Sequence, residues 1–246
     1  MALTLTVLGC DGSHAGPGPA GAASGYLLRS WTTGDCLWLD AGPGTFANLQ
    51  RFCDPRRLTG IVLSHEHLDH WTDVEGLVTA ARWTWRWDRD PVPVLAAPGI
   101  AARLAQPIDG ILDWSEVGDG DTVALGGVRL TFSRTDHGPV TLAVRVEGAG
   151  RVLGYSADSG PGWSLAALGS DLDLALCEAT FTKEYEGTVQ HMSGRQAGRS
   201  ARAAGARRLV LTHRSPAVEA GAVAAEAAEA FGAPVETATV GRGFSL

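Results

Sequence analysis

The sequence predicts an α/β protein in which two mixed β-sheets pack together and helices cover the outer faces. Three observations support this class. Short apolar segments of strand length recur along the whole chain, helical segments alternate with them only after the first three strands, and Gly and Pro gather in loops such as 9–25, 41–45 and 158–162. This order fits neither a pure β-α-β series nor a pure sandwich. With 246 residues, of which 45% are hydrophobic, we expect a single domain over residues 1–246.

Turn residues divide the chain into its expected elements. Strands are expected at 3–9, 24–30, 36–40, 60–64, 93–97, 122–125, 128–134, 140–146, 151–156, 172–177, 207–212 and 235–239. Helices are expected at 44–52, 73–86, 99–106, 163–169, 193–205 and 216–231. Ser193 is a good N-cap and Gly205 a good C-terminal stop for the fifth helix. Pro216 suits the first turn of the last helix.

Charge and composition exclude several classes of protein. The chain carries 20 basic and 27 acidic side chains, a formal charge of -7, which argues against a basic nucleic-acid-binding surface. No apolar run approaches the roughly 20 residues of a membrane span, and the opening MALTLTVLGC lacks the basic region of a secretory signal. Four dispersed cysteines, without a CxxC pair, predict small buried thiols in a reduced, cytoplasmic protein: Cys10, Cys36, Cys53 and Cys177.

Three histidines and an aspartate lie within six residues directly after the apolar segment 60–63. His65 and His67 are two apart, so they point the same way at an extended strand end. Asp69 and His70 follow where the chain turns, so they can point to a second position nearby. Such a cluster has no packing use, and imidazole with carboxylate suits zinc, and also manganese or iron. We therefore expect it to give two ligands to each of two metal ions.

Three more polar residues follow apolar strands in the same manner. His137, Asp158 and His213 are each the first ligand-capable residue after the expected strands 128–134, 151–156 and 207–212. Sites in α/β folds form at strand ends. Together with the cluster, these residues make seven candidate ligands for two metals.

This set resembles the metallo-β-lactamase-fold superfamily, from the opening strand to about residue 240. The matching residues, in chain order, are His65, His67, Asp69, His70, His137, Asp158 and His213. The resemblance implies a four-layer αββα sandwich. It implies one metal held by His65, His67 and His137, a second held by Asp69, His70 and His213, and Asp158 bridging them. In such a site two dications share a water that becomes a hydroxide nucleophile, and Asp69 also helps to orient it.

A second set of segments resembles the ribonuclease Z and cyclic-nucleotide phosphodiesterase branch, and most closely small actinobacterial members described as atypical cyclic-AMP phosphodiesterases. These segments are LCEATF from Leu176, HMSGRQA from His191 and LTHRSP from Leu211, with LGCDGS, SGYLL and DAGPGT near the N-terminus. The likeness implies a Glu178–His191 pair beside the metals. His191 would protonate the leaving alkoxide, with Glu178 holding its ring and raising its pKa.

Several departures narrow the expected substrate. True ribonuclease Z inserts a long tRNA-binding arm between the third His and the bridging Asp, whereas here Asp158 follows His137 by 21 residues. A Cys in place of Asp158 would have suggested the commonest lactamases. The 33 residues after His213 are too few for the helical domain of glyoxalase II enzymes. Two bound dications would bring the net charge to about -3, so that an acidic surface surrounds a positive site. This distribution of charge favours a small anionic phosphodiester over a long polyanion as the substrate.

Other functions stay open at this point. An RNA endonuclease of the ribonuclease Z type and a lactonase or other ester hydrolase use the same ligands. A regulatory protein that kept the fold but lost catalysis should lack ligands, and this sequence lacks none.

Some residues have weaker signals. His14 lies in the Gly-rich loop 9–25, as a surface residue or a substrate contact. Ser64, Thr212 and Ser215 are either hydrogen-bond partners of the ligands or plain turn residues. Trp83, Trp85 and Trp87 lie at the end of the expected helix 73–86 and just after it. On a helix, Trp83 and Trp87 share one face and Trp85 lies on the opposite face, which favours packing in a homodimer. Core packing, lid packing and stacking on a base are the alternatives.

Overall fold

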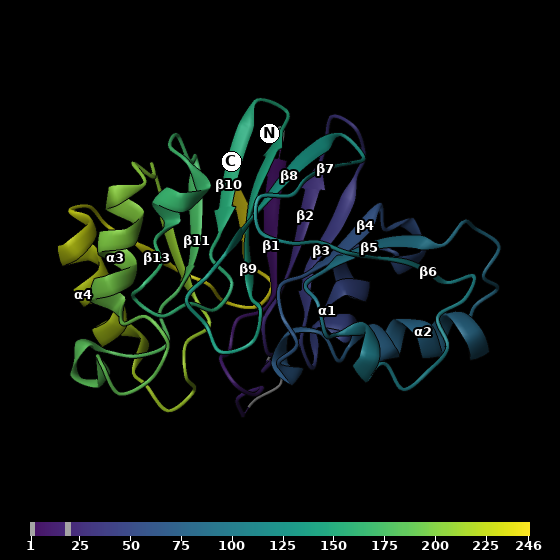
Figure 1. The fold of residues 1–246 in the computed structure, drawn as a ribbon, viewed down its shortest axis with the longest axis horizontal. Coiled ribbons are helices and arrows are strands. Elements are labelled where there is room, and N and C mark those ends of the chain that lie inside the picture. Colours follow the sequence, from purple (N-terminus) through teal and green to yellow (C-terminus); the bar gives the residue numbers. More distant parts are fainter. Residues whose placement is uncertain (1–2, 18–20) are drawn as a thin grey trace.

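The computed structural model describes residues 3–17 and 21–246, which form two seven-stranded sheets (Figure 1). The first sheet contains, in spatial order, β14 (Gly243–Ser245), β1 (Leu3–Gly9), β2 (Gly25–Ser30), β3 (Cys36–Ala41), β4 (Gly60–Leu63), β5 (Val92–Ala96) and β6 (Leu112–Glu116). The second contains β13 (Glu236–Thr237), β12 (Leu209–Thr212), β11 (Leu174–Glu178), β10 (Arg151–Tyr155), β9 (Leu142–Gly148), β8 (Val128–Arg134) and β7 (Thr122–Leu125).

Both sheets are mixed, as the sequence predicts. In the first, β14, β1, β2 and β3 pair antiparallel, and β3 to β6 pair parallel. In the second, β7 to β10 pair antiparallel and β10 to β13 pair parallel. The parallel strands are mostly buried on both faces because helices cover the outer side of each sheet. Their carboxyl ends therefore lie along one edge of each sheet, where sites form.

The helices form the outer layers of the fold. The helices α1 (Thr45–Phe52) and α2 (Val74–Trp83) pack against the first sheet, and α3 (Gly194–Ala203) and α4 (Ala220–Phe231) cover the second (Figure 1). A third apolar cluster, which includes Leu5, Leu39 and Val144, fills the space between the two sheets. The order helix, sheet, sheet, helix confirms the predicted four-layer αββα sandwich.

Some expected elements differ from those observed. The expected helices 99–106 and 163–169 shrink to the 3₁₀ turns Ala101–Arg103 and Leu165–Leu168. The edge strands β6 and β14 were not predicted, because each is short and partly exposed and so lacks a clear apolar pattern. The helix α3 begins after Ser193, whose side chain accepts from the Gln196 N–H in a capping box.

The last helix begins later than expected. The helix α4 starts at Ala220 rather than at Pro216, because the Glu219 side chain accepts from the backbone N–H groups of Gly221 and Ala222. This cap satisfies two donors of the first turn. Pro216 instead lies in the preceding turn.

The tryptophan cluster is not a helix face. Since α2 ends at Trp83, Trp85 and Trp87 lie beyond the helix, and both pack against the core under the first sheet. Trp83 alone projects, with 80% of its surface exposed. The expectation of a helix apolar on two faces is therefore wrong, and core packing explains two of the three residues. The homodimer stays a prediction, now confined to Trp83.

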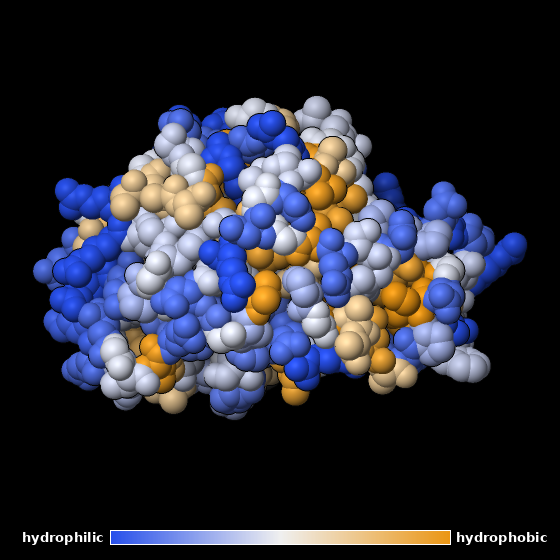
Figure 2. Space-filling model, in the orientation of Figure 1, coloured by the Kyte–Doolittle hydropathy of each residue, from blue (hydrophilic) through white to orange (hydrophobic). Residues whose placement is uncertain are grey.

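The face drawn in Figure 2 is mostly hydrophilic, with apolar residues near the middle and on the side of α2. Among the described residues, no helix combines the length and apolar character needed to cross a membrane.

Candidate metal centre

The predicted ligands come from strand ends in both sheets. His65 and His67 follow β4, and the 3₁₀ turn Leu68–His70 carries Asp69 and His70. The residues His137, Asp158 and His213 follow β8, β10 and β12 of the other sheet. The carboxyl ends of β4, β10 and β12 face each other across the inner layer, so residues up to 148 positions apart meet in one cluster.

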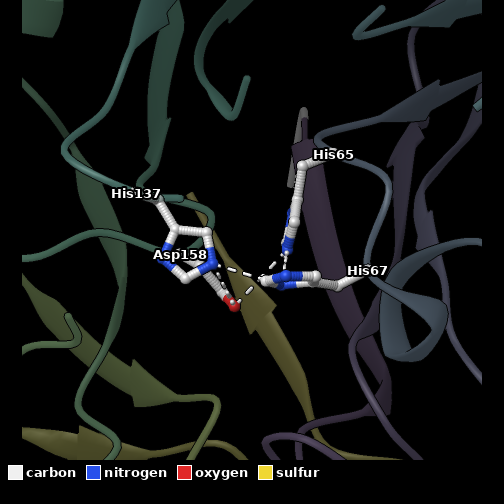
Figure 3. A group of neighbouring side chains, drawn as sticks. All are labelled: His65, His67, His137 and Asp158. Atoms are coloured by element: carbon white, nitrogen blue, oxygen red, sulfur yellow. Dashed lines mark hydrogen bonds and ion pairs between the residues drawn. The ribbon is translucent and has the colours of Figure 1, made fainter. Parts of the chain in front are cut away.

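A first group of four side chains converges as Figure 3 shows: His65, His67, His137 and Asp158. One ligand atom from each lies within 4.8 Å of the others. His67 Nδ1 is 3.0 Å from His65 Nε2 and 3.2 Å from His137 Nε2. Asp158 Oδ2 is 3.6 Å from His65 Nε2. Three imidazoles around a carboxylate are the donor set that zinc prefers.

A second group, Asp69, His70 and His213, lies next to the first. Asp69 Oδ2 is 3.3 Å from His213 Nε2 and 3.6 Å from His70 Nε2. Asp158 joins the two groups, with Oδ1 3.3 Å from His70 Nε2 and Oδ2 3.3 Å from His213 Nε2. The arrangement thus matches two adjacent ligand sets with a shared carboxylate.

Two buried atoms indicate that a cation belongs here. Within the described residues, His70 Nε2 and Asp158 Oδ1 are buried and make no hydrogen bond, although they lie 3.3 Å from each other. Orphaned polar atoms of this kind are rare in folded proteins, since each costs about 1–3 kcal/mol. Both atoms are good metal donors, so the residues present fit divalent metal ions such as zinc, manganese or iron.

The electrostatics favour the ligand forms of His65 and Asp158. Burial, and then the positive charge of His70, lowers the pKa of His65 well below its usual value, so this imidazole is neutral. Burial alone would raise the pKa of Asp158, but His213 and His70 hold it well below its usual range. Burial opposes the charged form of His70, yet Asp158 and Asp40 raise its pKa well above normal. The carboxylates of this cluster therefore favour positive charge at a buried position.

The centre lies inside a recognised family domain. Residues 37–214 match the family described as the beta-lactamase superfamily domain, which covers all seven predicted ligands. The chain belongs to the beta-lactamase superfamily. The resemblance expected from the His and Asp pattern is thereby confirmed.

Relatives within this superfamily match nearly the whole chain. An uncharacterised protein of Mycobacterium leprae is 34% identical, with 100% of this chain and 89% of that protein covered. A ribonuclease Z of Mycolicibacterium paratuberculosis is 28% identical over 89% of this chain and 88% of its own. The crystal structure of the metallo-beta-lactamase fold protein YhfI from Bacillus subtilis superimposes with a TM-score of 0.89, at 25% identity and full coverage of both chains.

Asp40 is a residue of this centre that the sequence pattern does not single out. Its buried carboxylate accepts from His70 Nδ1 at 2.7 Å, from Tyr155 Oη at 2.6 Å and from the Ser64 hydroxyl and N–H at 2.8 Å each. The bond to Nδ1 leaves His70 Nε2 facing the centre. The available signal was the one used for Asp158: an aspartate at the end of an apolar strand.

We expect Asp40→Asn to weaken metal binding about 10–100-fold, because the amide removes the charge that orients His70. Titration of the metal-free protein with zinc, followed by calorimetry, measures this change. Asp113→Asn is the matched control, since Asp113 is exposed on β6. Unchanged affinity in the Asp40 variant would contradict the orienting role.

The other expected hydrogen-bond partners give a mixed result. Ser64 contacts His65 Nδ1 at 3.0 Å, as anticipated. Thr212 instead bonds Tyr26 Oη at 2.5 Å, and Ser215 lies in a backbone turn. Thr180, which the sequence pattern does not single out, contacts His213 Nδ1 at 3.0 Å.

The predicted Glu178–His191 pair forms at the side of the centre. His191 Nδ1 is 3.0 Å from Oε1 of the fully buried Glu178 at the end of β11. The ring of His191 stacks on that of His213, 5.3 Å between centroids. Burial opposes the charged form of His191, but the charge and hydrogen bond of Glu178 raise its pKa to about 9.

The position of His191 is compatible with two roles. A ligand atom of His191 also lies within 4.8 Å of those of Asp158 and His213, close enough to share a metal. The role of proton donor therefore stays a prediction.

The Gly-rich loop 9–25 reaches the centre through Gly12 rather than through His14. A Cβ on Gly12 would lie 2.7 Å from the carbonyl oxygen of His213 and 2.9 Å from its Nδ1, so only glycine fits. His14 is exposed, and its backbone N–H bonds the Gly12 carbonyl. A surface role describes His14 best.

Proposed function

We propose that the protein is a metal-dependent hydrolase that cleaves a small phosphodiester, such as a cyclic nucleotide. The observation that carries this proposal is the Glu178–His191 pair, which lies directly against His213 and His137 of the ligand groups. A phosphodiester has a poor alkoxide leaving group, so a proton donor beside the metals is the added feature its cleavage needs.

The residues have separate tasks in this proposal. His65, His67 and His137 hold one ion, preferably zinc, while manganese or iron fits the same donors. Another ion is held by three further residues with Asp158 shared between the sets: Asp69, His70 and His213. When bound, the metals supply charge that polarises the phosphoryl group and an activated water.

The hydrogen bonding of His191 indicates which of its two ring nitrogens donates the proton. Because Glu178 accepts from Nδ1–H, the ring is fixed and its Nε2 is the nitrogen left to meet the leaving oxygen. Glu178 itself is fixed, since it also accepts from the Ser159 N–H at 2.6 Å and the Thr180 hydroxyl at 2.7 Å. In this scheme His191 donates to the alkoxide and Glu178 stabilises the imidazolium. Asp69 helps to orient the attacking water.

Two observations favour a small substrate. The interval between His137 and Asp158 is filled by the hairpin of β9 and β10, which leaves no tRNA-binding arm in that interval. The formal charge of -7 also opposes binding of a long polyanion.

An aromatic pair beside His191 favours a substrate that carries a planar base. The ring centroid of Phe181 is 5.3 Å from that of Tyr185 and 6.3 Å from that of His191. Tyr185 is 48% exposed, so its ring is available for stacking. A nucleobase is the group such a surface accepts.

A second candidate is RNA cleavage, favoured by the ribonuclease Z relatives at 28% identity. The lactonase alternative rests only on the shared ligands. Both become outcomes of the test below.

One preparation with measured metal content should be assayed against cyclic nucleotides, a cyclic alkyl phosphate without a base, precursor tRNA, lactones and a β-lactam. We expect turnover of the cyclic nucleotides, with a lower KM than for the alkyl phosphate, and loss of that activity after chelation. Activity restricted to precursor tRNA would favour the RNA endonuclease. Activity restricted to lactones would overturn the proposal.

A further inference from the structure

Two cysteines meet at the end of β3 that lies away from the metal centre. Cys36 begins β3, whereas Asp40 lies near its other end, and Cys53 caps the C-terminus of α1. Each thiol lies close enough to affect the pKa of the other. Both are free cysteines, and both line a pocket of about 360 Å³. Sequence spacing does not indicate this pair, because its members are 17 positions apart and meet only where the end of α1 packs beside the start of β3.

The pocket around the pair is positively charged. Arg29, the cross-strand partner of Cys36, and Arg57 both line it. The Arg29 guanidinium donates to the Phe52 carbonyl and lies 4.9 Å from the ring centroid of Trp31, so it is held beside the thiols. Asp54, also in the lining, is paired with Arg56. A fixed guanidinium next to a thiol is the environment that makes cysteines nucleophilic.

The four cysteines therefore differ in character. The neighbouring Cys53 thiol, and then Arg29, act against burial and lower the pKa of Cys36. Burial and the charge of Asp11 raise the pKa of Cys10 to about 12, although Cys10 is the most exposed of the four. Burial and Glu178 likewise raise the pKa of Cys177. If exposure decided reactivity, Cys10 would react first. If the pKa of the thiol decides it, Cys36 reacts first.

We propose that Cys36 and Cys53 form a thiol redox site that reacts with anionic low-molecular-weight disulfides of the glutathione type. The volume and the two arginines of the pocket suit a small carboxylate-bearing ligand. Two neighbouring thiols in one pocket supply both an attacking and a resolving sulfur.

The exchange proceeds in two balanced steps. The Cys36 thiolate attacks one sulfur of the disulfide, a mixed disulfide forms, and the other half leaves as a thiolate that takes up a proton. The Cys53 thiol then loses its proton and attacks the Cys36 sulfur, which expels the second half as a thiol. The net reaction converts one small disulfide and two protein thiols into two small thiols and a Cys36–Cys53 disulfide.

The test uses the reduced full chain and oxidised glutathione. After timed exposure, free thiols are alkylated under denaturing conditions and the digested protein is analysed by mass spectrometry. We expect peptides joined by a disulfide between Cys36 and Cys53, whereas Cys10 and Cys177 should be recovered as alkylated thiols. The wild-type chain alone gives this answer, and the assay does not depend on hydrolase activity. Modification of Cys10 first, or four free thiols throughout, would overturn the proposal.

Single substitutions test the role of each sulfur and of the positive charge in the pocket. Cys53→Ser should stop at a glutathione adduct on Cys36, whereas Cys36→Ser should block the reaction, and Cys177→Ser should behave as wild type. Arg57→Gln should slow the reaction with oxidised glutathione about tenfold and leave that with the cationic disulfide cystamine unslowed. Equal slowing of both probes would contradict an anionic ligand.

Discussion

His191→Ala is expected to lower kcat for a cyclic nucleotide by about 10²–10⁴-fold, the usual contribution of a positioned proton donor. The reason is the geometry: Glu178 holds Nδ1 at 3.0 Å, and the ring lies against His213 at the edge of the ligand groups. An alkoxide leaving group needs the proton, whereas nitrophenolate does not. The loss should therefore be small for an activated nitrophenyl diester.

The controls distinguish this role from metal binding. Metal content of the His191 variant should equal that of the wild type, and His14→Ala, a change at an exposed histidine, should leave both substrates unaffected. Equal losses on the two esters would exclude proton donation. Loss of metal from the variant would instead assign His191 as a ligand, which its distance to Asp158 and His213 permits.

Asp158→Ala is expected to abolish retained metal and to reduce hydrolysis to background. Asp158 is the residue whose two oxygens reach both groups: Oδ1 is 3.3 Å from His70 Nε2, and Oδ2 is 3.3 Å from His213 Nε2 and 3.6 Å from His65 Nε2. Removing this buried carboxylate takes a donor from both sets at once and removes the negative charge that faces the buried His65 ring.

Metal content after dialysis, measured by elemental analysis, tests this expectation. Asp158→Asn is the matched variant, because it keeps the side-chain volume and one oxygen but not the charge, so it should retain metal more weakly than the wild type. Asp109→Asn, at an exposed position, should change nothing. Full metal retention by Asp158→Ala would contradict a shared carboxylate and with it the two-site arrangement.

Most of the centre was predictable because its signal is local. His137, Asp158 and His213 each follow an apolar strand, and together with the cluster from His65 to His70 they could be selected as a set. The Glu178–His191 contact was implied by the family resemblance. The register of β11 on β12 pairs Glu178 with Thr212 and so places Glu178 beside His213.

Asp40 shows why the rest could not be predicted. In sequence it resembles Asp158, an aspartate after an apolar strand, yet it serves as an acceptor for His70 rather than as a member of either ligand group. The difference comes from parallel pairing of β3 with β4, in which Leu39 lies opposite Val62 and Asp40 therefore lies beside Ser64. Chain periodicity does not report such a register between strands.

Local pattern also fails where packing decides. The segment 99–106 has helix-favouring residues, but Ala101, Ala102 and Arg103 are exposed, so only a 3₁₀ turn forms. The sequence by itself determined the fold class, the family resemblance and the seven candidate ligands, because residue type and period encode them locally. The tertiary structure alone decided that Asp40 holds His70, that Trp85 and Trp87 pack against the core, and that Cys36 and Cys53 line one pocket. These outcomes depend on which strands pair and on which surfaces the helices and strands bury.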